Sequence, residues 1–314
     1  MIGLSIVIPV FRGADTIAPL ARELAALDIA GGLELVLVND GSPDDSGAVI
    51  RRLVDELPVP VTAIELARNF GEHNAVMAGY AVARGAFVIN IDDDFQNPPA
   101  EVKKLYDHAR NHPELDVVYT RYASKQHPMY RNLGSRFTNW VAGFLLDKPK
   151  GLYLSSFRCI NAFLRERVSA YQGPYPYIDG LILQTTRRIG SIAVEHRERG
   201  QGESGYTLRK LGRLWIAMFV NFSVMPLRAS GLLGFGISLL GMLVAIAAVV
   251  ERYFGNTPQG WTSLMAAILV FSGVQLLMLG LLGEYLGRLY LTTTGRPQYV
   301  VRELHRRGGE PAGH

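Results

Sequence analysis

Short β-rich runs alternate with stretches of helical character up to about Thr120, and this alternation restricts the chain to few folds. Most positions in the β-rich runs are apolar, so both faces of the strands are expected to be buried. Such strands form a parallel sheet with helices on both sides. The expected strands are Ser5–Val10, Glu34–Asn39, Thr62–Leu66, Ala86–Ile91 and Asp116–Thr120. The expected helices are Thr16–Leu27, Asp44–Leu57, Asn69–Ala83 and Pro99–His112.

Two long apolar runs near the C-terminus contain no charged residue. Ala229–Val250 and Leu264–Gly283 are each long enough to cross a bilayer, which takes about 20 apolar residues. Basic residues gather before the first run and after the second, so the positive-inside rule places both flanks in the cytoplasm. The basic, amphipathic stretch Leu208–Phe222 suits a helix in the membrane interface. Buried core helices are the alternative interpretation of the two runs.

The composition narrows the class of protein. Apolar residues make up 48% and charged residues 19%, a skew expected if part of the chain meets lipid. The net charge of +4 suits nucleic acid, an anionic membrane surface or phosphate-bearing ligands. The single cysteine excludes an internal disulfide. The start of the chain reads as a strand and not as a signal peptide, so we expect the N-terminus in the cytoplasm.

Three consecutive aspartates, Asp92, Asp93 and Asp94, follow the fourth expected strand. Clustered carboxylates repel one another, so a bound cation would stabilise them. Alternate residues of an extended segment point the same way, which makes Asp92 and Asp94 the natural pair. Carboxylate oxygens suit Mg²⁺ or Mn²⁺, and such an ion also binds phosphate oxygens. An acidic loop with capping roles is the alternative.

A further acid, Asp40, follows the second expected strand in the segment VNDGS. Ligands of parallel α/β sheets bind at the carboxyl ends of the strands, so Asp40 is placed to accept hydrogen bonds from a base or a ribose. Asp-Gly turns are common, and a simple turn is the alternative. The chain has neither a G-x-G-x-x-G nor a Walker A pattern, which argues against dinucleotide and P-loop enzymes.

Taken together, the motifs resemble those of the family 2 glycosyltransferases that make polyprenyl-phosphate sugars. This group includes dolichol-phosphate mannose synthase and bacterial undecaprenyl-phosphate sugar transferases. The resemblance covers nearly the whole chain and implies a GT-A catalytic domain, which is Rossmann-like with a mostly parallel sheet. It also implies an inverting transfer, a nucleotide-diphosphate sugar donor and a divalent metal, Mg²⁺ or Mn²⁺. The motifs are SIVIPVF, VNDGSPDDS, ARNFGEHNAVMAGY, IDDDFQNPP, TRY followed by YR, RGQGESGY, PLR and GEYLGRLY.

Carried over position by position, the resemblance assigns roles to individual residues. The metal and diphosphate site comprises Asp92, Asp94 and Gln96. The nucleotide contacts are Pro9, Phe11, Asp40 and Asp93. Arg121 and Arg131 would hold the acceptor phosphate, and arginine suits bidentate phosphate recognition. Arg199 and Ser204 match a mobile loop near the active site.

The sequence departs from the family pattern at two places. Arg12-Gly13 stands where many members have Asn-Glu. Ser156 stands where many members have an aspartate that is assigned as a base. The acceptor is a phosphate monoester with a second pKa of about 6, so it needs positioning more than deprotonation. Asp179 is a candidate catalytic group, as a polar anchor for the sugar or the acceptor, with loop capping as the alternative.

The sequence therefore predicts a multi-pass protein of the inner (cytoplasmic) membrane, with its catalytic domain and both termini in the cytoplasm. Its partners would be a nucleotide-sugar donor, with uridine favoured by analogy with bacterial relatives, and a polyprenyl (undecaprenyl) phosphate lipid. No nucleic acid is expected, and relatives suggest a homotetramer. The predicted parts are a GT-A domain (1–205), an amphipathic juxtamembrane helix (206–228), two transmembrane helices (229–250 and 264–283) and a cytoplasmic tail (284–314) that is disordered after Leu304.

Two alternative functions are compatible with parts of the pattern. A processive polysaccharide synthase shares the fold and the acids, but it would need more membrane helices and a Q-x-x-R-W motif, which the chain lacks. A non-catalytic membrane protein that binds nucleotide sugars is the second alternative, and Ser156 keeps it open. The identity of the sugar is not readable from the sequence.

Overall fold

The computed structural model describes residues 2–122, 152–173, 176–195, 260–295 and 297–307, together with 232, 234–236, 239 and 243. The chain divides into two compact units. The first comprises Met1–Gly205 and Gly295–His314, and the second comprises Tyr206–Thr294.

An eight-stranded sheet forms the centre of the first unit, in the order β7-β5-β6-β4-β1-β2-β3-β8. Strand β1 pairs in parallel with β2 and β4, β2 with β3, and β5 with β7. Strand β6 is antiparallel to β4 and β5, and β8 is antiparallel to β3. The strands are β1 (Leu4–Val10), β2 (Leu33–Asn39), β3 (Val61–Leu66), β4 (Phe87–Asn90), β5 (Val117–Tyr122), β6 (Arg158–Asn161), β7 (Ile189–Val194) and β8 (Val301–Arg306).

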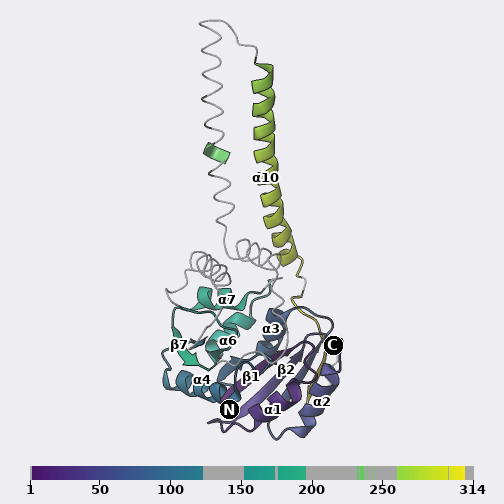
Figure 1. The fold of residues 1–314 in the computed structure, drawn as a ribbon, viewed down its shortest axis with the longest axis vertical. Coiled ribbons are helices and arrows are strands. Elements are labelled where there is room, and N and C mark those ends of the chain that lie inside the picture. Colours follow the sequence, from purple (N-terminus) through teal and green to yellow (C-terminus); the bar gives the residue numbers. More distant parts are fainter. Residues whose placement is uncertain are drawn as a thin grey trace. The chain divides into compact units, whose positions relative to one another are not determined.

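Helices cover both faces of this sheet (Figure 1). They are α1 (Ile17–Ala25), α2 (Ser46–Glu56), α3 (Glu72–Val82), α4 (Pro99–Asn111), α6 (Ala162–Ser169) and α7 (Ile178–Thr185). One apolar core lies between the sheet and α1, α2 and α4, and the other lies between the sheet and α3, α6 and α7. Along β1, Ile6 and Ile8 enter the first core while Val7 enters the second, because successive side chains of a strand point to opposite faces. The predicted mostly parallel, two-sided sheet is confirmed.

Three strands were not expected from the sequence. No strand was predicted after Thr120, yet β6 and β7 lie there, and β8 lies in the predicted tail. The prediction of a tail that is disordered after Leu304 is wrong over the described residues, because β8 pairs with β3 through Arg306. Pairing β8 along β3 covers an edge that would otherwise expose unpaired backbone groups.

In the second unit, helix α10 (Trp261–Thr293) contains the second apolar run and continues into the predicted tail. Within the part of the chain that the structure describes, none of the helices combines the length and the apolarity needed to cross a membrane. The amphipathic stretch and most of the first apolar run lie outside the described residues. The two transmembrane helices therefore stay a prediction.

Helix α3 approaches strand β1 closely because residue 79 has no side chain. A Cβ at Gly79 would lie 2.3 Å from Cγ1 of Val7, well inside van der Waals contact. We expect Gly79→Ala to destabilise the first unit by about 1–3 kcal/mol through overpacking, measured as a lower melting temperature by circular dichroism. Adding Val7→Ala removes the clashing methyls and should restore part of the loss. An unchanged melting temperature for Gly79→Ala would contradict the close packing.

Candidate functional site

Four segments meet at one edge of the sheet. The segments after β1, β2 and β4 reach this edge because the three strands run parallel. The segment before β6 reaches it because β6 is antiparallel to β4. Strand β5 is antiparallel to β6 and therefore ends at the same edge, close to Arg121. This edge is where α/β sheets bind ligands.

The acidic loop after β4 is built by a tight turn. Phe95 has a φ of 58°, in the left-handed region, and the backbone N–H of Gln96 donates to Asp94 Oδ1 over 3.2 Å. Asp93 packs against the loop after β1, since a Cβ at Gly13 would lie 2.1 Å from Asp93 Oδ2. A glutamate at position 13, as the family pattern would have it, does not fit this arrangement. The glycine found there is thus explained by the position of Asp93.

Asp40 is buried and holds the loop that leads into α3. Its Oδ1 accepts from the N–H of Phe70 over 2.7 Å and its Oδ2 from the N–H of Gly71 over 2.9 Å. Burial raises the pKa of Asp40, and the two backbone hydrogen bonds partly offset that rise. Asp40 was predicted to contact the nucleotide. In the structure both of its oxygens are already engaged, so such a contact would use their remaining lone pairs.

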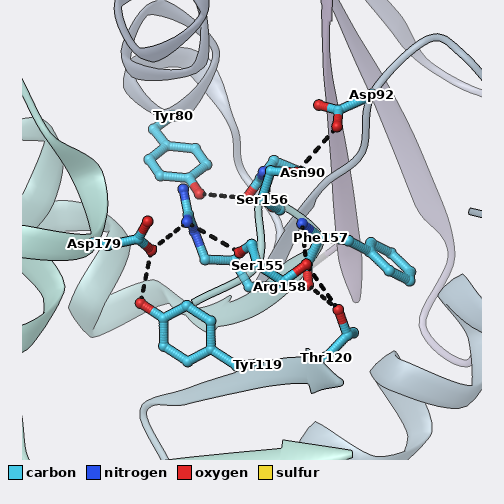
Figure 2. Close-up of polar contacts among 10 residues, drawn as sticks. All are labelled: Tyr80, Asn90, Asp92, Tyr119, Thr120, Ser155, Ser156, Phe157, Arg158 and Asp179. Atoms are coloured by element: carbon cyan, nitrogen blue, oxygen red, sulfur yellow. Dashed lines mark hydrogen bonds and ion pairs between the residues drawn. The ribbon is translucent and has the colours of Figure 1, made fainter. Parts of the chain in front are cut away.

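A buried ion pair joins β6 to α7 (Figure 2). Arg158, only 2% exposed, donates to Asp179, and the hydroxyl of Tyr119 donates to the same carboxylate oxygen over 2.9 Å. Burial disfavours the charged guanidinium, but Asp179, Tyr80 and Tyr119 together more than offset this and raise the pKa of Arg158. The sequence placed Asp179 against the sugar or the acceptor. The structure places its carboxylate against Arg158 and Tyr119, and the predicted contact with the sugar or the acceptor stays a prediction.

Glu72, the first residue of α3, also belongs to this site. Glu72 keeps part of its surface exposed, but desolvation by its neighbours raises its pKa to about 7. The nearby charges of Asp92, Asp179 and Asp94 add to the rise, while Arg158 opposes it. Sequence reasoning missed Glu72, although it lies in one of the motifs that carried the family resemblance. Glu72 could have been recognised from the sequence only if the packing of α3 against β1 and β2 had been known.

The remaining predicted site residues differ in exposure, and three of them lie outside the described part of the chain. Pro9 lies in β1 and is half-buried, whereas Phe11 is exposed and has the guanidinium of Arg12 over its ring. Arg121 is exposed near the end of β5. The predicted residues that lie outside the described part of the chain are Arg131, Arg199 and Ser204.

The acidic loop offers ligands of the type a hard cation prefers. Asp92 and Asp94 contribute carboxylate oxygens, and Gln96 adds an amide oxygen. Among the described residues, no group of three or more His, Cys, Asp and Glu side chains could hold a metal. Mg²⁺ is commonly held by one or two carboxylates and completes its shell with substrate phosphates and water. The residues present therefore fit an ion that is bound together with a diphosphate.

Comparison with known proteins decides the family. Residues 5–172, more than half of the chain, match the family model described as Glycosyl transferase family 2. The chain belongs to glycosyl transferase family 2. A second family model, the GtrB C-terminal hairpin, matches residues 225–289. The predicted family is confirmed, and the protein is a glycosyltransferase.

The similar family members include proteins named undecaprenyl-phosphate 4-deoxy-4-formamido-L-arabinose transferase. The protein from Pseudomonas savastanoi pv. phaseolicola is 33% identical over 316 residues, 98% of this chain and 92% of the relative. The one from Pseudomonas aeruginosa strain LESB58 is 35% identical over 312 residues, 96% of this chain and 90% of the relative.

Among solved structures, the fold is similar to glucosyl-3-phosphoglycerate synthase from Mycobacterium tuberculosis in complex with Mn²⁺, UDP-glucose and phosphoglyceric acid. The TM-score is 0.51 at 18% identity, over 69% of this chain and 77% of that one. At that identity the likeness concerns the fold, and it agrees with the GT-A architecture of the glycosyltransferase.

The Arg158–Asp179 pair leads to a stability prediction. Asp179→Asn keeps the size of the side chain but leaves the buried guanidinium without its counter-charge, which should cost about 3–5 kcal/mol. The melting temperature should fall strongly, and a double variant with Arg158→Met should lose less than Asp179→Asn alone. A normal melting temperature combined with lost sugar transfer would instead place Asp179 against a substrate.

Glu72 makes the stability of the protein depend on pH. Its pKa of about 7 in the folded protein lies above the ordinary 4.5, so the unfolded chain releases this proton at lower pH. The free energy of unfolding therefore falls as pH rises from 4.5 through 7, because the folded protein still binds this proton when the unfolded chain has lost it. Glu72→Gln should raise the melting temperature near pH 8, with no gain at a pH of about 4. Melting curves in EDTA across this range test the prediction, and a pH-independent difference would contradict it.

Proposed function

We propose that this glycosyltransferase transfers a sugar from a UDP-sugar to the phosphate of undecaprenyl phosphate, with inversion at the sugar C1. The proposal rests on one observation above all. Relatives named as undecaprenyl-phosphate sugar transferases are 33–35% identical over nearly the whole chain. The acidic loop at the ligand-binding edge of the sheet is the matching chemical feature.

The donor diphosphate would lie at the acidic loop. Asp92, Asp94 and Gln96 would hold a divalent cation, Mg²⁺ or Mn²⁺, and such an ion supplies charge neutralisation to the leaving diphosphate. The solved synthase of similar fold contains Mn²⁺ and UDP-glucose, which supports both ligand classes. The chain's own contribution is to fix the ligand oxygens, as the turn at Phe95 does for Asp94.

The acceptor phosphate does not need a base on the protein to deprotonate it. A phosphate monoester, with a second pKa of about 6, carries enough negative charge near neutral pH for one of its oxygens to attack the sugar C1. The bond from C1 to the diphosphate oxygen breaks, and the nucleoside diphosphate leaves with the electron pair. Arg121, at the end of β5, and Arg131 would hold the acceptor phosphate by charge-assisted hydrogen bonds. Ser156 in place of a carboxylate is compatible with this chemistry.

A lipid acceptor requires the protein to reach a membrane. The two uncharged runs, 229–250 and 264–283, support an attachment to the inner membrane with the catalytic unit and both termini in the cytoplasm. The match of residues 225–289 to a C-terminal hairpin family and the exposed leucines of α10, such as Leu276 and Leu289, are further support.

A panel of nucleotide-sugar donors would identify the transferred sugar. The full-length protein, purified in detergent, is incubated with undecaprenyl phosphate, Mg²⁺ or Mn²⁺ and radiolabelled nucleotide sugars. The UDP-sugar of 4-deoxy-4-formamido-L-arabinose comes first because the relatives carry that name. Label in the organic phase supports the proposal. Donor that binds without any transfer would identify a nucleotide-sugar-binding protein and contradict it.

Asp94→Asn tests the acidic loop. The variant keeps the shape of the side chain but removes the charge, so transfer should fall by about 100-fold or more, measured as kcat/KM for the donor. Asp28→Asn changes an exposed aspartate before β2 and is the matched control, with activity unchanged. Wild-type turnover in Asp94→Asn would refute the role of the loop.

A further inference from the structure

Strand pairing brings Ser156 opposite Asp92. β4 and β6 pair antiparallel, with Asn90 opposite Arg158. Asp92 and Ser156 each lie two residues beyond this last pair, outside the strands. The hydroxyl of Ser156 donates to Asp92 Oδ2 over 3.0 Å (Figure 2). The contact thus lies just beyond the end of the β4–β6 pairing, which brings the two segments side by side.

The backbone of Ser156 is held by the strand next to it. Its carbonyl oxygen accepts from the side-chain amide of Asn90. The amide oxygen of Asn90 in turn accepts from the hydroxyl of Tyr80 over 2.9 Å, and Tyr80 is 1% exposed. Asn90 is therefore fixed from α3, and through it the position of Ser156 is fixed relative to β4.

The neighbours of Ser156 are held equally firmly. Thr120 on β5 donates to the carbonyl of Phe157 over 2.7 Å, and its hydroxyl oxygen lies 3.1 Å from that of Ser155. The carbonyl of Ser155 accepts from the buried guanidinium of Arg158 over 3.3 Å. With its carbonyl and both neighbours bound, Ser156 presents its hydroxyl to Asp92 from a nearly rigid support.

A hydroxyl donor suits a carboxylate that must remain a cation ligand. It fixes the orientation of Asp92 through Oδ2 and leaves the negative charge of the carboxylate intact. A cationic partner would neutralise that charge, and a second carboxylate so close would repel it. A serine hydroxyl is also not a base near neutral pH.

We propose that Ser156 is a positioning residue, which holds Asp92 in the orientation that binds the divalent cation of the donor complex. The inference rests on the proposed function of the acidic loop. It gives position 156 a role that differs from the base expected there from the family pattern. It also makes the Tyr80–Asn90 pair part of the support of the cation site.

The test compares Ser156→Ala, which removes the donor, with Ser156→Thr, which keeps it. Mn²⁺ binding to the full-length protein with UDP is measured by electron paramagnetic resonance, alongside kcat and KM for the donor. Ser156→Ala should bind Mn²⁺ about 10-fold more weakly or worse, as for other outer-shell partners. Ser156→Thr should remain within about threefold of the wild type. Ser191→Ala, at an exposed serine of β7, is the matched control.

Melting temperatures separate positioning from folding. All variants should melt near the wild-type temperature. If Ser156→Ala does not fold, Ser156→Cys replaces it, because cysteine has a similar size and is a weaker hydrogen-bond donor. Its Mn²⁺ affinity should fall between those of the wild type and the ten-fold loss. Wild-type affinity in Ser156→Ala, or equal losses in Ser156→Ala and Ser156→Thr, would overturn the proposal.

The same measurements distinguish this inference from the proposed function. If the wild type binds Mn²⁺ with UDP and Asp94→Asn does not, the acidic loop is the cation site, and the Ser156 variants then decide the positioning role alone. If the wild type binds no Mn²⁺ and transfers sugar without a metal, both the cation site and the role of Ser156 are refuted.

Discussion

The pairing of β4 with β1 on one side and β6 on the other holds the site together. The parallel pairing brings the acidic loop beside the segment after β1, where Asp93 packs onto Gly13. The antiparallel pairing brings Ser156 opposite Asp92. A slip of one residue in either register would turn the acids toward the opposite face of the sheet. The apolar side chains of β4, buried in both cores, oppose such a slip.

Electrostatics adds a second constraint on this edge of the sheet. Asp92, Asp94, Asp179 and Glu72 lie near one another, and the buried Arg158 compensates part of their charge. Its pairing with Asp179 ties α7 to β6. A cation bound at this edge would offset part of the repulsion among these carboxylates.

A segment near the C-terminus adds the edge strand β8 to the sheet of the first unit. Strand β8 follows α10 and pairs with β3, so the residues on both sides of the second unit belong to the first. Arg306 donates to Thr62, and Arg307 donates to the carbonyl of Asp55 over 2.7 Å. The catalytic unit therefore includes residues from both ends of the chain, although its family model ends at residue 172.

The sequence by itself determined the alternating strands and helices, the acidic loop after β4 and the family. These features depend on local periodicity and on short motifs, which a single segment carries in full. Only the tertiary structure decided that Ser156 supports Asp92, that Asp179 neutralises Arg158, that Glu72 joins the acids and that β8 completes the sheet. The partners in these contacts are far apart in the chain, 64 positions for Ser156 and Asp92. Strand register and helix packing bring them together, and no local pattern specifies either.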